Sequence, residues 1–252
     1  MANSLTLERM TTSTANKTTV LITGANRGLG RETARRLGAL GWTVWLGARD
    51  AEQAAAVAAE LSRHNADVRP IQLDVTDDAS VEAAAKSVAA EHDHLDVLVN
   101  NAGIPGGWIQ TEEVTPADFL PVYGVNVLGP VRMTRAFLPL LRASSQPRIV
   151  MVSSGMGSFG ITTDSDRFES TLKSLVYTSS KAALNMITSQ YAKALDGVQV
   201  NAVDPGYTDT EFNDHRGTQT VREGTDAIVT LATADPDGPT GGYFDRSGPI
   251  PW

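Results

Sequence analysis

Short β-branched segments that alternate with longer Ala-rich segments are the feature that most limits the fold of this chain. The first, TTVLIT at residues 18–23, is a continuous apolar run typical of a strand buried on both faces. Similar runs follow at residues 43–48, 68–75, 95–101, 148–154 and 198–204, with a weaker one at 241–244. Strands that alternate with helices form a parallel sheet covered by helices. The sequence therefore predicts an α/β protein: a single doubly wound parallel sheet, Rossmann-like, with about seven strands and helices on both faces.

Two of the intervening segments carry signals for the start of a helix. Asp50 precedes an Ala-rich stretch and is followed three residues later by Gln53, and Thr220 is followed in the same way by Glu223. A short polar side chain at such a position accepts hydrogen bonds from the free N–H groups of the first helical turn, and Gln or Glu three residues on reciprocates. We predict that Asp50 and Thr220 are N-caps.

No linker or long-period repeat divides the chain, so residues 17–252 are predicted to form one dinucleotide-binding and catalytic domain. Residues 1–16 are rich in Thr, Ser and Asn and are expected to be a flexible N-terminal extension. They lack the basic segment followed by an apolar segment that is typical of a signal peptide. No run in the chain approaches 18 apolar residues, so we expect a cytoplasmic protein without a membrane partner. The net charge of −8 argues against nucleic acid as a partner, and the absence of cysteine excludes disulfides and thiolate chemistry.

A glycine-rich segment, TGANRGLG, joins the first strand to the following helix. Glycine there permits a tight turn and a close approach of the backbone to a ligand, and a helix N-terminus suits a pyrophosphate. The spacing is Gly-x-x-x-Gly-x-Gly rather than the commoner Gly-x-Gly-x-x-Gly, and a plain strand-to-helix turn is the alternative. We predict a cofactor-binding loop made of Gly24, Asn26, Arg27, Gly28, Leu29 and Gly30.

The end of the second strand indicates which dinucleotide the chain would bind. An acidic residue there would accept the ribose hydroxyls of NAD, but the segment reads WLGARD, and its Asp50 is explained as a helix cap. Arg49, and Arg27 from the glycine-rich loop, would instead flank a 2′-phosphate, which favours NADP(H). The alternatives are that both arginines are solvated surface residues and that the cofactor is NAD(H).

The next two strand ends supply further candidates for cofactor contacts. Asp74 ends the third strand, where its side chain could meet the adenine, and the small residues of NNAG at 100–103 let the backbone lie near a cofactor. Either segment could also be an ordinary turn. The candidate residues are Asp74, Val75, Asn101, Ala102 and Gly103.

A tyrosine and a lysine share one face of a predicted helix in the segment VYTSSKAALNMI. Tyr177 and Lys181 lie four residues apart. At ~4 Å and an effective dielectric near 20, their attraction is about 4 kcal/mol, or up to ~3 pKa units as an upper bound. We therefore expect the pKa of Tyr177 to fall towards 7, where a phenol is a useful acid–base catalyst. Taken alone, the pair could be an ordinary amphipathic one.

The glycine-rich loop, NNAG, the serine pair at 153–154 and Tyr-x-x-x-Lys follow one another in an order that resembles the short-chain dehydrogenase/reductase family. From residue 18 onwards the chain is similar to the carbonyl-reductase-like members, through SSGMGSFG, YTSSKAALN, DPGYTDT and GPTGGYF. The resemblance implies the strand order 3-2-1-4-5-6-7 and an NADP(H)-dependent enzyme that reversibly reduces a ketone or aldehyde. Its partner would be a small-molecule carbonyl or alcohol substrate.

The resemblance also assigns roles to four catalytic residues. Tyr177 would donate its proton to the carbonyl oxygen as hydride arrives from the nicotinamide, and Lys181 would also hold the nicotinamide ribose. Ser154, the second of the serine pair, would hydrogen-bond the carbonyl. Asn126, in the helix before the fifth strand, would support a water-linked proton relay. In DPGYTDT, the residues Pro205, Gly206, Thr208 and Thr210 would present backbone and hydroxyl groups to the carboxamide.

The chain departs from most members of the family between Ser154 and Tyr177, which lie 23 residues apart. This longer polar segment could be a substrate wall, an interface blocker or a surface helix. If it covers the surface through which relatives pair, a monomer or weak homodimer is favoured over a tetramer.

Apolar and aromatic residues near the carboxyl ends of the strands could line a pocket for a hydrophobic ketone or aldehyde, although they could equally be core residues. They are Ile104, Trp108, Met156, Phe159, Tyr207 and Phe212. No metal site is predicted, because His92 and His94 lack converging ligands. A rival function is that of a non-catalytic NADP(H)-binding sensor or scaffold.

Overall fold

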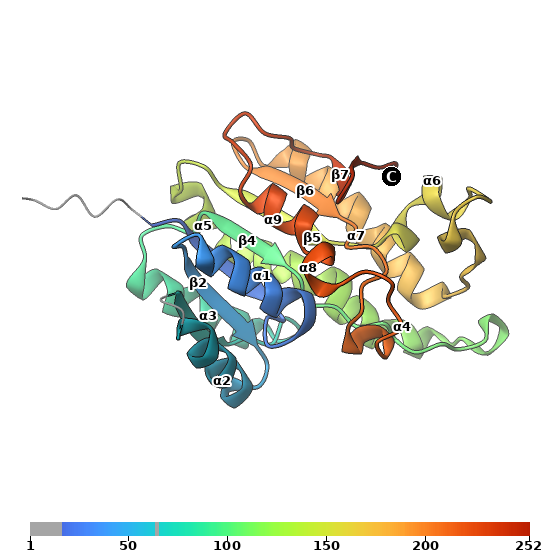
Figure 1. Ribbon diagram of the computed structural model, residues 1–252, viewed down its shortest axis with the longest axis horizontal. Coiled ribbons are helices and arrows are strands. Elements are labelled where there is room, and N and C mark those ends of the chain that lie inside the picture. The colour runs from blue at the N-terminus through green and yellow to red at the C-terminus, as the bar shows by residue number, and fades with distance from the viewer. Residues whose placement is uncertain (1–16, 64–65) are drawn as a thin grey trace, which may run out of the picture.

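The computed structural model describes residues 17–63 and 66–252, and it contains one eight-stranded sheet with the order β3-β2-β1-β4-β5-β6-β7-β8 (Figure 1). The predicted extension, residues 1–16, lies outside the described residues. The first seven strands are parallel, which confirms the predicted order, and β8 pairs antiparallel with β7. The strands are β1 Thr19–Thr23, β2 Thr43–Ala48, β3 Asp67–Gln72, β4 Val97–Asn100, β5 Arg148–Val152, β6 Gln199–Val203, β7 Tyr243–Asp245 and β8 Gly248–Pro249.

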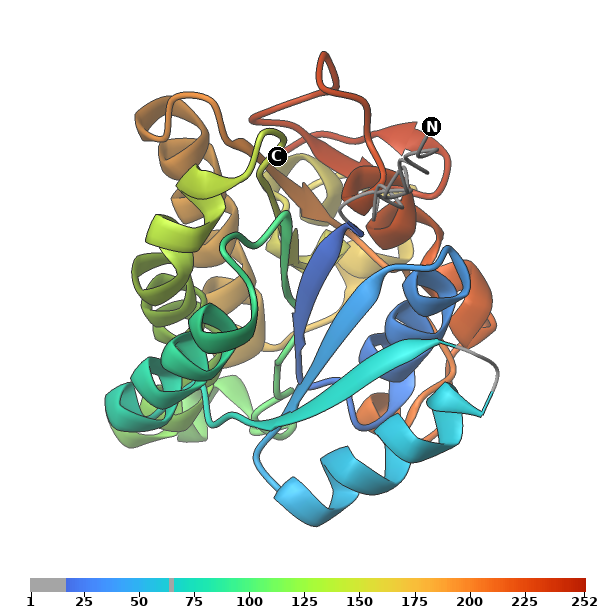
Figure 2. The same ribbon diagram turned by 90° about the vertical axis from the view of Figure 1, so that its left-hand side faces the viewer.

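Helices cover both faces of the sheet, as Figure 2 shows. One face packs against α1 (Gly28–Ala39), α2 (Ala51–Ser62) and α9 (Asp226–Ala232), and the other against α3 (Asp78–Glu91), α5 (Gly129–Ala143) and α7 (Leu175–Ala194). The shorter helices are α4 Pro116–Tyr123, α6 Phe159–Thr162 and α8 Val221–Gly224. Within the part of the chain that the structure describes, no helix is long and apolar enough to cross a membrane.

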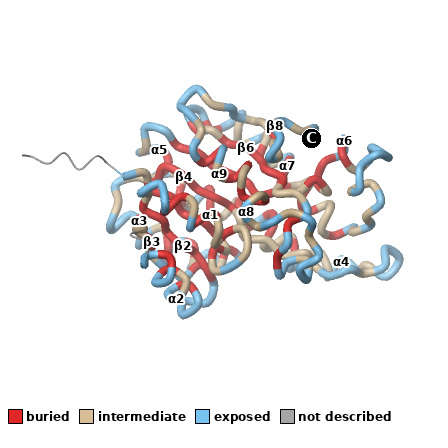
Figure 3. Tube along the Cα trace, viewed as in Figure 1, coloured by how far each residue is buried: buried red, intermediate tan, exposed pale blue. Residues whose placement is uncertain are grey.

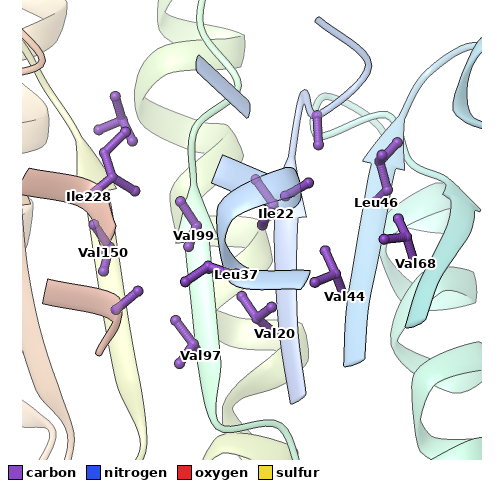
Figure 4. Close-up of a cluster of buried hydrophobic side chains, with 14 of the residues drawn as sticks. Val20, Ile22, Leu37, Val44, Leu46, Val68, Val97, Val99, Val150 and Ile228 are labelled. Atoms are coloured by element: carbon purple, nitrogen blue, oxygen red, sulfur yellow. The ribbon is translucent and has the colours of Figure 1, made fainter. Parts of the chain in front are cut away.

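The core forms two layers because successive side chains of each strand point to opposite faces. In β1, Val20 and Ile22 pack under α1, whereas Leu21 packs on the opposite face. Figure 4 shows the first layer, in which side chains from five strands meet Leu37 of α1 and Ile228 of α9. Figure 3 shows that burial is concentrated along the sheet. Each fully buried side chain of this size contributes about 1.5–3 kcal/mol, so the sheet is a rigid platform for the loops at its carboxyl edge.

Both predicted N-caps are present. Asp50 Oδ1 accepts from the backbone N–H groups of Glu52 and Gln53 at 2.9 and 3.0 Å, and Gln53 Nε2 donates to Asp50 Oδ2 at 2.9 Å. Thr220 and Glu223 form a reciprocal capping box. The helix that Thr220 begins is short, however: α8 ends at Gly224, and α9 continues after a break at Thr225.

Candidate active site

The glycine-rich loop has the backbone geometry that its sequence predicts. Gly24 and Gly28 have φ angles of 62° and 51°, in the left-handed region that favours glycine. A Cβ atom on Gly30 would lie 2.5 Å from the carbonyl oxygen of Gly24, so a side chain there would force α1 away from the loop. The loop is therefore held close to the first turn of α1.

The N-terminus of α1 is suited to an anionic ligand. Arg27 occupies the N-cap position and makes no side-chain cap hydrogen bond, which leaves the N–H groups of the first turn to other acceptors. Asn101 Nδ2 donates to the carbonyl oxygens of Thr23 and Gly24 at 2.8 and 3.1 Å, and this ties the loop to the end of β4. Across the loop, Thr210 Cγ2 lies 3.5 Å from the position of a Cβ on Gly28. These residues fit the pyrophosphate of a dinucleotide.

The two arginines predicted to select the cofactor lie on adjoining segments. Asn26 Nδ2 donates to Gln53 Oε1 at 2.8 Å, so the loop that carries Arg27 contacts the start of α2, next to Arg49. Both arginine side chains are exposed. Both carboxylate oxygens of Asp50 are occupied by the helix cap, which leaves Asp50 poorly placed to accept ribose hydroxyls.

The remaining candidates for adenosine contacts surround the same edge of the sheet. Asp74 Oδ1 accepts from the backbone N–H and the hydroxyl of Thr76 at 2.9 and 2.7 Å. Burial acts to raise the pKa of Asp74, but the hydrogen bonds from Thr76 outweigh it and hold this pKa below its usual value. The Val75 side chain is buried against Gly129, so only its backbone faces this edge. The Ala102 N–H donates to Thr23 Oγ at 2.9 Å.

Tyr177 and Lys181 lie on one face of α7, as predicted, with Lys181 Nζ 5.7 Å from the centre of the tyrosine ring. Lys181 is buried, and its Nζ donates to the carbonyl oxygen of Val152 at 2.8 Å. Ser154 lies close enough to Tyr177 to lower the pKa of the phenol, and its hydroxyl accepts from the Met156 N–H at 3.3 Å. The structure thus brings together three of the four residues assigned to catalysis.

The hydroxyl groups of Ser153 and Ser154 lie in two different environments. Ser153 is buried and donates to Asn185 Oδ1 on α7 at 2.5 Å. Ser154 begins the 3₁₀ turn η3, Gly155–Gly157, and is only half-buried. A Cβ on Gly157 would lie 2.7 Å from Lys181 Cβ, so this turn packs directly on the catalytic helix. The chosen serine, Ser154, is the one that reaches Tyr177.

The expected lowering of the tyrosine pKa is wrong for this structure. Burial raises the pKa of Tyr177, and the negative charge of Asp204 adds to this, whereas the nearby Ser154 hydroxyl opposes it. Burial lowers the pKa of Lys181 to about 8, with Asp204 opposing this shift. Desolvation outweighs the attraction between the pair because Lys181 is buried, Tyr177 is partly buried and the ammonium is bonded to a carbonyl oxygen.

Asn126 lies not in a regular α-helix but in a π-helical turn, η2 at Gly124–Leu128, between α4 and α5. Its Nδ2 donates to the Ile104 carbonyl and to Ser180 Oγ, each at 3.0 Å, and its Oδ1 accepts from the Ile104 N–H at 2.9 Å. A Cβ on Gly103 would lie within 3.6 Å of both Asn126 Oδ1 and Lys181 Nζ. Asn126 is therefore next to the catalytic lysine, and Ser180 is a neighbour that the sequence motifs did not identify.

The segment after β6 closes over the site from the other side. Gly206 has a φ of 68°, which suits glycine in the Pro205–Gly206 turn. Thr208 is buried and donates its hydroxyl to the Pro205 carbonyl at 2.9 Å, so this side chain stabilises the turn itself. Thr210 begins the 3₁₀ turn η5, Glu211–Asn213, above the glycine-rich loop.

The six residues predicted to contact substrate lie at different distances from the catalytic tyrosine. The Phe212 ring is 5.7 Å from that of Tyr177, and Met156 and Ile104 contact Ser154 and Asn126 through their backbones. Tyr207 packs against Phe168 of the long polar segment at 6.1 Å. Trp108 and Phe159 are 64% and 75% exposed, the most of the six. Their roles stay predictions.

An open cavity of about 490 Å³ borders the Pro205–Gly206 turn. The polar segment contributes a wall to it through Arg167, Phe168 and Glu169, opposite Tyr207 and the β7–β8 turn. Its walls carry both apolar and charged groups, and of the six candidate residues only Tyr207 lines it. In the described part of the chain, no group of three or more His, Cys, Asp or Glu side chains is placed to hold a metal ion.

A family model for the short chain dehydrogenases matches residues 18–220, which include the glycine-rich loop, Ser154, Tyr177 and Lys181. The chain belongs to the short-chain dehydrogenase family. It is 38% identical to the short-chain dehydrogenase anuI of Penicillium roqueforti, over 86% of this chain and 89% of that protein. It is 34% identical to (+)-neomenthol dehydrogenase of Arabidopsis thaliana, over 90% of this chain and 95% of that protein.

Solved structures of short-chain dehydrogenases superpose on the whole described fold. The NADPH-bound carbonyl reductase from chicken fatty liver has a TM-score of 0.82 and 29% identity, over 94% of this chain and 99% of that one. Salutaridine reductase from Papaver somniferum has a TM-score of 0.80 and 28% identity, over 91% and 100%. This short-chain dehydrogenase is therefore an oxidoreductase with the full fold of its relatives.

Proposed function

We propose that this short-chain dehydrogenase reduces a ketone or aldehyde to an alcohol with NADPH, and catalyses the reverse reaction with NADP. The observation that carries the proposal is the meeting of Ser154, Tyr177 and Lys181 at the carboxyl ends of β5 and β6, on the same edge of the sheet as the glycine-rich loop. Ligands bind at this edge in doubly wound sheets.

The nicotinamide, when bound, supplies the hydride. The chain supplies a proton and the groups that orient the carbonyl. Because burial raises the pKa of Tyr177, its phenol stays protonated at neutral pH and is able to give a proton to the developing alkoxide. The Ser154 hydroxyl, which lies near that phenol, would hydrogen-bond the same oxygen. The Lys181 ammonium, still charged below a pKa of about 8, stabilises the phenolate that remains.

After the reaction, a proton would return to Tyr177 along a chain of neighbouring polar groups. Lys181, Asn126 and Ser180 lie together next to Gly103, and they form the inner end of a route on which a water molecule would connect the lysine to solvent. The π-helical turn at Asn126 supports this assignment, because such turns are frequent at functional sites.

The choice of NADP(H) rests on Arg27 and Arg49, which flank the expected position of the 2′-phosphate, and on the occupation of Asp50 by its helix cap. The NADPH bound to the chicken carbonyl reductase is consistent with this choice. At this edge an arginine attracts the 2′-phosphate and an aspartate repels it, so the charge of these side chains is enough to discriminate NADP(H) from NAD(H).

The proposal is tested by incubating the purified protein with NADPH and a panel of ketones and aldehydes, and with NADP and hydrophobic alcohols such as neomenthol, for which a relative is named. We expect substrate-dependent loss of NADPH absorbance, and loss of this activity in the Tyr177→Phe variant. Tight NADPH binding without turnover on any compound would favour a sensor or scaffold instead.

A further inference from the structure

Asp204 is a buried carboxylate that none of the assigned roles explains. It follows the last residue of β6 and is 6% exposed. Side chains alternate along the strand, and Val200 packs on the face that α7 covers. The alternation places Asp204 on this same face, beside the catalytic helix. A carboxylate is costly to bury without partners, so its contacts indicate what it does.

The carboxylate joins the two turns that form the site. Asp204 Oδ1 accepts from the Gly206 N–H at 3.0 Å, and Asp204 Oδ2 lies against the backbone of Gly155. A Cβ on Gly155 would lie 2.8 Å from Asp204 Oδ2, so only glycine fits at this point of the Ser154 turn. One side chain thereby connects the turn that carries Ser154 with the Pro205–Gly206 turn.

The charged groups around Asp204 come from three other elements. Glu169 of η4 (Phe168–Thr171) and Asp245 of β7 oppose its ionisation, and Lys181 of α7 is the cation whose charge it favours. Tyr177 and Tyr243 are the phenols whose ionisation it disfavours. Arg167 and Arg246 line the neighbouring cavity, where they pair with Glu169 at 3.6 Å and with Glu223 at 2.8 Å. Burial raises the pKa of Asp204 and its acidic neighbours add to this, whereas the hydrogen bond from the Gly206 N–H opposes it.

We propose that Asp204 is a positioning residue for the reaction: its carboxylate holds the Ser154 turn against the Gly206 turn, beside the helix that carries Tyr177 and Lys181. This inference rests on the proposed function and adds a residue to it. It explains why a strand end that faces the catalytic helix carries an acidic residue where a small or apolar one would be easier to bury.

The test compares Asp204→Asn with Asp245→Asn. The first change removes the charge while keeping the shape of the side chain, and it replaces the oxygen beside Gly155 with an amide nitrogen that cannot accept a hydrogen bond. The second removes an equal charge from the next strand end, where Oδ1 only accepts from the Ser247 and Gly248 N–H groups. Asp204→Ser is a second neutral variant that is easily accommodated by volume.

We expect Asp204→Asn to lower kcat for carbonyl reduction by about 10- to 100-fold, as small misplacements of catalytic groups do. Its pH profile should lose activity at lower pH than wild type on the alkaline side, because without the negative charge both Lys181 and Tyr177 give up their protons more easily. Asp204→Ser should share this shift. Asp245→Asn should leave the alkaline side of the profile at the wild-type pH, because removing this acidic neighbour only favours the ionised form of Asp204.

Two readouts do not depend on turnover. The pH at which NADPH binding weakens, followed by its fluorescence, should move down in both neutral Asp204 variants, since Lys181 is assigned to the ribose. The melting temperature of the cofactor-free protein should fall further in Asp204→Asn than in Asp245→Asn, because a link between two turns is lost.

An unchanged pH dependence of both rate and NADPH binding in the Asp204 variants, or a shift matched by Asp245→Asn, overturns the inference. Wild type that binds NADPH but reduces no carbonyl overturns the proposed function instead, and the binding profile then still decides the role of Asp204.

Discussion

Lys181 Nζ lies one helical turn from Tyr177, 5.7 Å from the centre of its ring, and donates at 2.8 Å to the Val152 carbonyl oxygen. The ammonium is therefore fixed between the sheet and the phenol rather than free to move. Lys181 is buried and Tyr177 is partly buried, and charges act over longer distances in such an environment than in water. The behaviour of each is expected to depend on the other.

Tyr177→Phe removes the proton donor and nothing else, because the ring is kept. We expect kcat for carbonyl reduction to fall by about 10²–10⁴-fold, the range for a lost general acid, with little change in the Kd of NADPH. Tyr191→Phe is the matched control, since Tyr191 lies on the same helix and packs on the core beneath it. Steady-state kinetics and NADPH titration check the pair. Turnover above about a tenth of wild type would contradict the role of Tyr177.

Lys181 sets the expected pH dependence of the reduction. Burial lowers its pKa to about 8, so the ammonium is present below that pH and is lost as the pH rises through it. We expect kcat/KM for reduction to be level near neutrality and to fall above about pH 8. Lys181→Arg keeps its charge at every accessible pH and should remove this fall, even if its absolute rate is lower. An identical alkaline limb in the two proteins would show that another group titrates.

Ser154 and Ser153 form a matched pair of adjacent hydroxyls. Ser154→Ala should lower kcat about 10- to 1,000-fold without destabilising the fold, because its hydroxyl faces Tyr177. Ser153→Ala should instead lower the free energy of unfolding by about 1–3 kcal/mol, because Asn185 loses a buried partner. Activity assays and thermal melts separate the two effects. Exchanged phenotypes would mean that the wrong serine was chosen.

The cap at Asp50 and the shared face of Tyr177 and Lys181 could be predicted from the sequence because each depends on a local pattern. The order of the parallel strands came from the resemblance to the family. The sequence did not predict strand β8, whose two residues Gly248–Pro249 have no apolar pattern. It also missed the break at Gly224, where a Cβ would lie 2.3 Å from Thr208 Oγ1. These features arise from contacts between distant segments.

In the candidate site, too, some features could be predicted from the sequence and others depend on contacts between distant segments. Motif order placed Ser154 next to Tyr177, but the direction of the tyrosine pKa depends on burial, which spacing does not reveal. The roles of Asp204 and Ser180 likewise depend on which turns meet in space. The two arginines could be proposed from the sequence because the glycine-rich loop and the end of β2 are fixed positions in doubly wound folds, and their role stays a prediction.

Glu223 gives a prediction for stability against pH. Its carboxylate accepts from the Thr220 N–H and hydroxyl, each at 2.9 Å, and from Arg246 at 2.8 Å, and these contacts lower its pKa from 4.5 to about 2. A carboxylate whose pKa is lower in the folded than in the unfolded state stabilises the fold at pH values above its unfolded-state pKa. This stabilisation is lost as the pH falls through its folded-state pKa. Glu223→Gln should therefore melt below wild type at neutral pH, with the difference shrinking between about pH 4.5 and 2.

The control for Glu223 is Glu112→Gln, a change at an exposed glutamate of the short η1 turn, Thr111–Glu113. Melting curves of the three proteins across the acid range give the comparison. A difference between Glu223→Gln and wild type that is constant with pH would mean that shape, and not charge, stabilises this helix start.

Cofactor choice is expected to depend on Arg49 and Arg27. A charge-assisted hydrogen bond to the 2′-phosphate is worth roughly 1.5–3 kcal/mol, so Arg49→Ala should lower kcat/KM for NADPH about 10- to 100-fold and leave NADH nearly unchanged. Arg49→Asp should go further, because a carboxylate repels the phosphate and accepts ribose hydroxyls. Arg35→Ala is the control, since Arg35 pairs with Glu32 on the outer surface of α1. The measurement is the ratio of kcat/KM for the two cofactors with one carbonyl substrate. If wild type already prefers NADH, or if Arg49→Ala lowers both values equally, the arginines are surface residues and the assignment to NADP(H) fails.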